Sequence, residues 1–512
     1  MLVKTYGAAV IGIDATLITV EVNITQGINF YLVGLPDNAV KESQQRIDSA
    51  LKTNNYKIPK KKIVINMAPA DIRKEGSAYD LTLAIGILGA AGEIPEEKLS
   101  EYMIMGELSL DGSIKPIKGA LSIAIEARNH GFKGFIVPIE NVNEAAVVNN
   151  LEVYGVSHIT EVVDFLREVK PLAPYKINTR ELFYQNLNNY PLDFSDVKGQ
   201  ENVKRAMEVA AAGGHNIIMI GSPGSGKTML ARRMPTILPP LSLAEALETT
   251  KIHSVAGKVN KGISLMTERP FRSPHHTISD VALIGGGTHP QPGEVSLAHN
   301  GILFLDELPE FKRNVLEVLR QPLEDKYITI ARSRYTVQYP ANFMLVAAMN
   351  PCPCGYYNHP EKDCVCSIGQ IQRYLNKISG PLLDRIDIHL EVIPVSFEKL
   401  SSNTPGENSK TIRERVISAR LIQQERFKTY PGIHTNSQMT PKLIREYCRL
   451  DKESNTLLKT AIDKFGLSGR AYDRILKVSR TIADMDNSTN IKSMHIAEAI
   501  GYRTLDKKGW LG

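Results

Sequence analysis

A phosphate-binding loop near the middle of the chain constrains the fold more than any other feature. The loop matches the pattern G-x-x-x-x-G-K-[ST] at every fixed position and comprises Gly221, Ser222, Pro223, Gly224, Ser225, Gly226, Lys227 and Thr228. The apolar run 216–221 before it is typical of a buried strand, and 229–234 after it of a helix start. In such loops, backbone N–H groups surround a polyphosphate, the lysine reaches the β- and γ-phosphates, and the hydroxyl holds Mg²⁺. The sequence therefore predicts an α/β unit that binds ATP or a close relative, together with Mg²⁺.

Length and composition indicate a soluble protein of several domains. A chain of 512 residues exceeds what one core accommodates, and 43% hydrophobic with 23% charged residues is ordinary for a globular protein. No apolar stretch approaches the roughly 20 residues that span a bilayer, and the N-terminus lacks a signal-peptide pattern. We therefore expect a cytoplasmic protein with no membrane partner.

The net charge of +6 is unevenly distributed. Residues 396–512 carry 21 lysines and arginines against 13 acidic residues, a local charge of +8, which leaves −2 for the remainder. A basic C-terminal module suits a polyanionic partner such as DNA, and a solvated helical surface would account for the charge equally well.

Sequence patterning divides the chain into four segments. Residues 1–172 alternate strand-like runs with amphipathic helices, as in a mixed α/β domain, and the polar stretch 173–192 is typical of a linker. Residues 193–395 form a second α/β unit, whose strands are expected at 217–220, 301–305 and 343–348. Residues 396–512 begin with a Ser/Asn-rich hinge and continue with helices expected at about 411–427, 441–449, 454–465, 469–485 and 493–503. An α/β nucleotide domain followed by a helical lid is the layout of AAA+ ATPases.

Two adjacent acids supply the second element that ATP hydrolysis requires. The apolar run from Gly301 ends in Asp306 and Glu307, about 80 residues beyond the phosphate loop. We predict that Asp306 holds Mg²⁺ together with Thr228 and that Glu307 polarises the attacking water.

Three polar residues farther along are candidates for the same reaction. Asn350 ends the third predicted strand and would orient the water, although a strand-end turn residue is the alternative. Arg385, bracketed by acids, is a candidate arginine finger for a neighbouring subunit or a partner in an ordinary ion pair. Arg470, at the start of a lid helix, could contact the γ-phosphate or remain solvated.

Four of the five cysteines fall within fifteen residues. Cys352, Cys354, Cys364 and Cys366 form two C-x-C pairs around a short loop, whereas Cys448 is interpreted as a core residue. Four thiolates suit a tetrahedral structural Zn²⁺, and in a cytosolic protein a metal is favoured over disulfides. Four reduced thiols in a loop are the alternative. His275 and His276 could also bind a metal, but we interpret them as packing residues near the nucleotide domain.

These elements together resemble the Mg-chelatase-like AAA+ ATPases of the ComM/YifB type over nearly the whole chain. The stretches that carry the resemblance are 271–276 (FRSPHH), 282–287 (ALIGGG), 292–301 (PGEVSLAHNG), 305–311 (LDELPEF), 379–387 (SGPLLDRID) and 467–476 (LSGRAYDRIL). The resemblance implies a hexameric ring in which Asn350 is sensor 1, Arg385 the arginine finger and Arg470 sensor 2.

The resemblance also implies two hairpins that project toward the pore of the ring. One would use the glycine-rich region 284–293 and the other residues 327–339, whose tip carries Arg332 and Arg334. Two arginines at a hairpin tip suit a phosphate backbone, and a surface hairpin with solvated charges is the alternative. We predict DNA contact by this tip.

The N-terminal domain resembles the Lon-protease-like (S5-like) fold through residues 68–81 and 106–119. Lon-type proteolysis requires a Ser/Lys dyad, yet the alignment places Ala78 at the serine position and Leu121 at the lysine position. Ser77 lies one residue away, and Lys118 falls where a glycine belongs. We therefore predict a scaffold for DNA or partners rather than a protease.

Three functions compete at this point. The family resemblance implies an ATP-driven DNA motor, a helicase or translocase that acts in branch migration of recombination intermediates during DNA uptake. Magnesium chelatase suggests instead an ATPase chaperone for metal insertion, and a protein remodeller is the third possibility. The Lon-like domain and the basic lid favour DNA.

Overall fold

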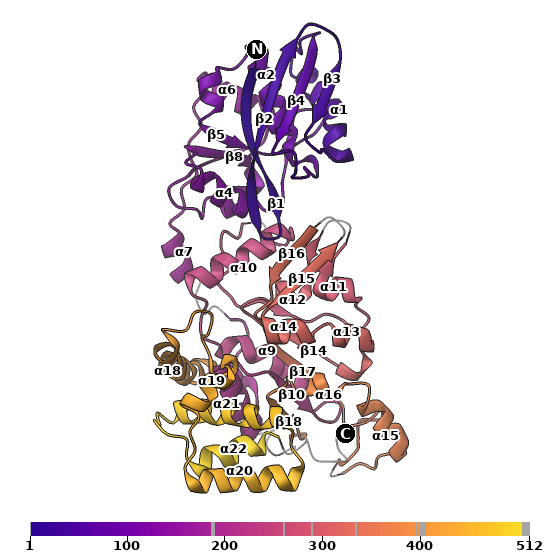
Figure 1. Ribbon diagram of the computed structural model, residues 1–512, viewed down its shortest axis with the longest axis vertical. Coiled ribbons are helices and arrows are strands. Elements are labelled where there is room, and N and C mark those ends of the chain that lie inside the picture. Colours follow the sequence, from indigo (N-terminus) through magenta and orange to yellow (C-terminus); the bar gives the residue numbers. More distant parts are fainter. Residues whose placement is uncertain are drawn as a thin grey trace. The chain divides into compact units, whose positions relative to one another are not determined.

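The computed structural model describes residues 2–185, 190–259, 262–287, 290–332, 335–359, 361–395, 398 and 406–503. The chain divides into two compact units (Figure 1). The N-terminal unit comprises Met1–Asn186 and Ser242–Thr267, and the second unit comprises Leu187–Leu241 and Glu268–Gly512.

A seven-stranded mixed sheet forms the centre of the N-terminal unit. Its order is β3-β4-β2-β1-β5-β8-β9, with β1 Leu2–Ile11, β2 Asp14–Thr25, β3 Phe30–Val33, β4 Lys62–Ala68, β5 Tyr102–Ile104, β8 Gly134–Pro138 and β9 Glu152–Val156. The principal helices are α1 (Asn38–Thr53), α2 (Asp80–Ala90), α4 (Ala120–Asn129) and α6 (Ile159–Leu166). Every residue of α2 is buried, because its sequence is almost wholly apolar and its first residue, Asp80, is paired with Arg46.

Part of the predicted second α/β segment, Ser242–Thr267, belongs to this N-terminal unit. Helix α10 (Leu243–Val255) begins at a capping box formed by Ser242 and Glu245. Lys251 Nζ of α10 lies 2.5 Å from Asp14 Oδ1, and Ser254 O accepts a hydrogen bond from the backbone N–H of Gly119 at 3.1 Å. Residues 242–267, which lie within the predicted core 193–395 in sequence, therefore pack with the N-terminal unit instead.

The second unit is built on a five-stranded parallel sheet. Its order is β11-β14-β17-β10-β18, with β11 Phe271–Arg272, β14 Ile302–Leu305, β17 Met344–Met349, β10 Ile217–Ile220 and β18 Ile388–Glu391. The three strands predicted from apolar runs are its three central strands. Because all the strands run in one direction, their carboxyl ends lie at a single edge, where ligands of such sheets bind.

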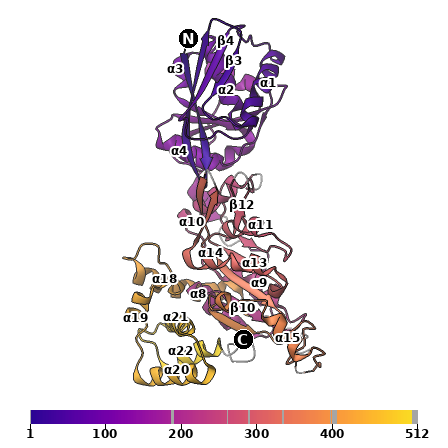
Figure 2. The ribbon, with the colours of Figure 1, turned by 45° about the vertical axis from the view of Figure 1, so that its right-hand side comes forward.

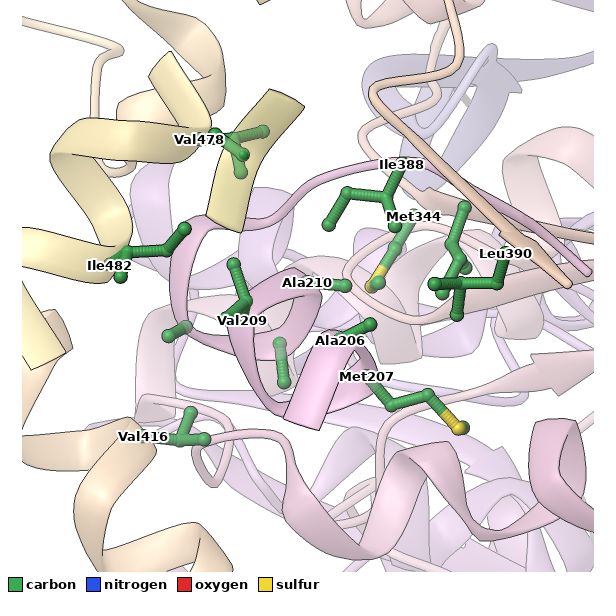
Figure 3. Packing of buried hydrophobic residues seen from close by; sticks show 14 of the residues in the cluster. Ala206, Met207, Val209, Ala210, Met344, Ile388, Leu390, Val416, Val478 and Ile482 are labelled. Atoms are coloured by element: carbon green, nitrogen blue, oxygen red, sulfur yellow. The ribbon is translucent and has the colours of Figure 1, made fainter. Parts of the chain in front are cut away.

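Helix α8 (Glu201–Gly213) packs between this sheet and the C-terminal helices (Figure 3). Its small residues Ala206 and Ala210 allow close approach to the sheet residues Met344, Ile388 and Leu390. The C-terminal helices contribute Val416, Val478 and Ile482 to the same buried cluster. The core sheet and the lid therefore share one hydrophobic core.

The lid consists of α18 (Ser409–Phe427), α19 (Pro441–Tyr447), α20 (Lys452–Phe465), α21 (Gly469–Met485) and α22 (Ser493–Gly501), which group together in Figure 2. Each begins and ends within about two residues of its predicted bounds, because caps and amphipathic periodicity are local signals. No helix in the described part of the chain combines the length and apolar content that a membrane crossing needs.

Both predicted hairpin regions contain paired antiparallel strands. β12 (Gly285–Gly286) pairs with β13 (Gln291–Pro292), and β15 (Tyr327–Arg332) pairs with β16 (Tyr335–Pro340). Arg334 and the side chain of Arg332 lie outside the described residues, so their predicted DNA contact stays a prediction.

Candidate active site

The phosphate loop joins the end of β10 to the start of α9 (Lys227–Ile237). Gly226, the residue before the helix, has φ +92°, a left-handed conformation that glycine adopts without strain. The turn therefore delivers Lys227 directly into the first turn of α9, where unpaired backbone N–H groups favour an anion.

Lys227 is buried among oxygen acceptors. Its Nζ donates to the carbonyl oxygens of Gly221 at 2.7 Å and Ser222 at 2.9 Å, and to Asn350 Oδ1 at 3.2 Å. Burial lowers the pKa of this ammonium, and the Asp306 carboxylate opposes the shift. A buried cation at a helix N-terminus fits the β- and γ-phosphates of a nucleotide, because their charge would compensate the lost hydration.

The predicted magnesium ligands meet across the sheet edge. Thr228 Oγ1 donates to Asp306 Oδ2 at 2.7 Å, although 78 residues separate them in the sequence. Hydroxyl and carboxylate oxygens are ligands that Mg²⁺ prefers, so this pair fits the ion that accompanies a bound nucleotide.

Glu307 follows Asp306 with φ +52°, so that successive side chains diverge after the strand end. Glu307 Oε2 lies 3.3 Å from His276 Nδ1, and the His276 ring also meets the Phe311 ring edge-on. The ring centroids of His275 and His276 lie 4.1 Å apart.

Sequence reasoning assigned His276 to packing and missed its contact with the candidate base. The residue follows the edge strand β11, and the neighbouring strand β14 ends beside Glu307. The HH dipeptide after a short apolar run gives no local sign of this neighbour, because strand order is a tertiary property.

The two candidate arginines form ion pairs within the second unit. Arg385 is 6% exposed, with Nη2 2.5 Å from Glu324 Oε1 and Nη1 donating to the carbonyl oxygen of Pro381 at 2.6 Å. The Arg470 side chain is 59% exposed, and its Nη1 lies 3.5 Å from Asp384 Oδ2. Their roles as arginine finger and sensor 2 stay predictions.

The four cysteines come together in the loop after β17. Their sulfur atoms all lie within 4.8 Å of one another, with Cys352 Sγ 3.3 Å from Cys354 Sγ and 3.7 Å from Cys364 Sγ. Zn–S bonds of about 2.3 Å in a tetrahedron place sulfur atoms about 3.8 Å apart. Cys366 completes the set, so the chemistry and spacing of these ligands fit Zn²⁺.

The N-terminal unit holds Ser77 against a carboxylate rather than a lysine. Ser77 Oγ donates to Glu107 Oε2, Leu121 is fully buried in α4, and Lys118 is exposed. A carboxylate partner with no lysine amine does not build a Ser/Lys dyad. The absence of proteolysis stays a prediction.

The fold and this edge of the sheet define a P-loop protein of the AAA+ class. Family models match residues 193–400 as "Magnesium chelatase, subunit ChlI", 20–141 as "Subunit ChlI of Mg-chelatase" and 406–503 as "Magnesium chelatase, subunit ChlI C-terminal". The chain belongs to the Mg-chelatase-like family of the ComM/YifB type.

Individual relatives cover this chain to very different extents. The competence protein ComM of Haemophilus influenzae is 44% identical over 506 residues, 98% of this chain and 97% of its own. YifB of Escherichia coli is 45% identical over 509 residues, which cover 98% of this chain and 96% of its own. The magnesium-chelatase 38 kDa subunit of Cereibacter sphaeroides is 26% identical over 180 residues, 31% of this chain and 53% of its own.

Proposed function

We propose that this protein is an ATP-hydrolysing AAA+ ring motor that acts on DNA, as a helicase or translocase in the remodelling of recombination intermediates during DNA uptake. The observation that carries hydrolysis is the meeting of Lys227, Thr228, Asp306 and Asn350 at one sheet edge. DNA as the substrate is supported by near full-length similarity to a protein named for competence, by the basic lid and by the predicted arginine tip.

Each residue at the edge has a distinct task. Bound Mg-ATP supplies the phosphoryl group for transfer to water. Lys227 neutralises phosphate charge, while Thr228 and Asp306 hold the metal. Glu307 accepts a proton from the attacking water, and Asn350 orients that water. Arg385 adds positive charge to the site of a neighbouring subunit in a cytoplasmic hexamer, and Arg470 contacts the γ-phosphate from the lid.

The second candidate is an ATPase chaperone for metal insertion or protein remodelling. The observation that favours it is the magnesium-chelatase name of the family models that match the chain. The chelatase subunit aligns with only 31% of the chain, however, whereas the competence relative aligns with nearly all of it.

Steady-state ATP hydrolysis by the full chain, alone and with single-stranded, duplex and four-way-junction DNA, separates these functions. We expect DNA to stimulate turnover, most strongly with branched DNA, and we expect Glu307→Gln to abolish it. Arg332→Ala/Arg334→Ala should lose the stimulation. The matched control Lys60→Ala/Lys61→Ala removes two exposed charges from the N-terminal unit and should keep it. ATPase activity indifferent to every DNA would favour the chaperone.

We propose Zn²⁺ as a structural cofactor of the four cysteines. Measured zinc should be about one ion per chain and should disappear in Cys364→Ser/Cys366→Ser. Cys448→Ala, which changes the cysteine outside the cluster, should keep it.

A further inference from the structure

The cysteine loop packs directly on the phosphate loop. Gly355 follows Cys354 and has φ +85°, and a Cβ added to it would lie 2.5 Å from Cδ and 2.7 Å from Cγ of Pro223. The same two loops line a cavity of about 200 Å³, whose walls include Gly221, Ser222 and Tyr357. The backbone at Gly355 therefore lies close against the ring of Pro223, and no larger residue fits there without displacing Pro223.

Hydrogen bonds that Cys352 accepts set the position of Gly355. The carbonyl oxygen of Cys352 accepts from the Gly355 N–H at 3.0 Å, and its Sγ accepts from the Tyr357 N–H at 3.3 Å. Cys352 also lies two residues beyond Asn350, whose Oδ1 contacts Lys227 Nζ at 3.2 Å. The cysteine loop thus reaches the phosphate-binding residues at two points, Pro223 and Lys227.

The loop is not held by regular secondary structure. Its described residues between Cys352 and Cys366 form neither helix nor strand, so no backbone ladder holds them. Four thiolates brought together without a cation would repel one another, whereas a shared cation binds them and orders the loop.

We infer that Zn²⁺ held by Cys352, Cys354, Cys364 and Cys366 keeps the phosphate loop in its nucleotide-binding shape through the contact of Gly355 with Pro223, so that affinity for nucleotide depends on zinc. The inference rests on the proposed ATP and zinc sites. The metal acts at a distance from the reacting atoms, and Gly355 is a positioning residue.

Two kinds of variant test this coupling in the full chain, with zinc content and the Kd of a fluorescent ATP analogue measured side by side. Cys364→Ser/Cys366→Ser removes the zinc and should weaken nucleotide binding about tenfold or more, since small displacements of positioning groups carry large costs. Gly355→Ala keeps all four thiols and should retain zinc while weakening nucleotide binding similarly.

A matched control and a rescue identify the contact itself. Gly131→Ala places alanine at a comparable φ of +76° with nothing within 4 Å, and should leave the Kd unchanged. Pro223→Ala in the Gly355→Ala background removes the ring atoms that clash, and should recover affinity toward that of Pro223→Ala alone.

The outcomes separate the parts of the proposal. Wild-type protein without zinc would overturn the metal site, and wild-type protein that binds no nucleotide would overturn the ATP site. If the wild-type protein contains zinc but both variants bind nucleotide with a Kd within about twofold of wild type, the coupling is overturned and both proposed sites stand. Thermal melting of each variant shows whether weak binding reflects unfolding, and retained zinc in Gly355→Ala gives a second check.

Discussion

His276 Nδ1 lies 3.3 Å from Glu307 Oε2, and this contact links the edge strand of the sheet to the proposed catalytic base. An imidazole at this distance can hold the carboxylate in one orientation by donating a hydrogen bond to it. The Glu307 side chain is 57% exposed, so the contact with His276 restrains a carboxylate that is otherwise largely surrounded by solvent.

We predict that His276→Ala lowers kcat by about 10- to 100-fold, while nucleotide affinity changes little, because Glu307 loses its restraint but the phosphate loop is untouched. Steady-state kinetics with a parallel nucleotide titration measure both quantities. His130→Ala removes a comparable imidazole near Glu126, where the two groups lie 3.5 Å apart, and should leave kcat intact. An unchanged kcat in His276→Ala would assign this histidine to packing alone.

Arg385 offers a test of whether the active site is shared between subunits. Arg385→Ala should lower kcat by about 10³-fold with nucleotide affinity retained, because an arginine finger acts on transition-state charge. Glu324→Gln weakens the ion pair of Arg385 without removing the guanidinium, and should keep most of the activity.

Rings assembled from two variants show whether Arg385 acts on the site of its own subunit or on that of a neighbouring subunit. Mixing Arg385→Ala with Glu307→Gln should recover activity, because some boundaries then combine an intact Glu307 with an intact Arg385. No recovery in rings shown to contain both variants would mean that Arg385 acts only within its own subunit.

Lys326 should make stability depend on pH above neutrality. Burial lowers its pKa from 10.5 to about 8, although Asp387 nearby partly opposes the shift and Arg474 reinforces it. Between these values the folded protein binds fewer protons than the unfolded chain, so stability rises as pH increases from about 8 to 10.5. Lys326→Met should therefore stabilise the protein at pH 7, by about 1–3 kcal/mol.

Thermal unfolding at two pH values measures this effect. The rise in Tm of Lys326→Met over wild type should shrink between pH 7 and pH values near 10. The exposed control Lys61→Met should show no such trend. A gain of equal size at both pH values would point to packing of the methionine rather than to relief of buried charge.

Asp484 holds two arginines inside the lid. The carboxylate is 2% exposed and accepts hydrogen bonds from Arg426 Nη1 at 2.6 Å, Arg480 Nε at 3.1 Å and Asn436 Nδ2 at 2.8 Å. Asp484→Asn should lower the free energy of unfolding by about 3–5 kcal/mol, because it leaves two largely buried guanidinium groups uncompensated. Denaturant unfolding measures this loss, and the half-exposed Asp486→Asn should cost far less.

The sequence was most informative where the signals are local. The phosphate loop, the acids at the end of β14 and the five lid helices depend on short motifs, caps and periodicity, and the structure places them as predicted. The meeting of Thr228 with Asp306 also followed from the sequence, because parallel strands bring their carboxyl ends to one edge.

Contacts that depend on the path of the chain in space could not be predicted from the sequence. The pairing of His276 with Glu307 requires knowing that β11 lies beside β14, and the contact of Gly355 with Pro223 requires the path of an irregular loop. The burial of Arg385 against Glu324 is of the same kind, since an arginine between acids has many available partners.

The excursion of residues 242–267 means that the chain passes between the two compact units three times, at about residues 186, 241 and 267. A single cut or a simple terminal deletion therefore cannot separate the units cleanly. A fragment that starts at residue 193 would retain α10 but lose Asp14 and Gly119, which bind it. A fragment that contains only the second unit therefore requires replacement of 242–267 by a short linker as well as removal of the N-terminal residues.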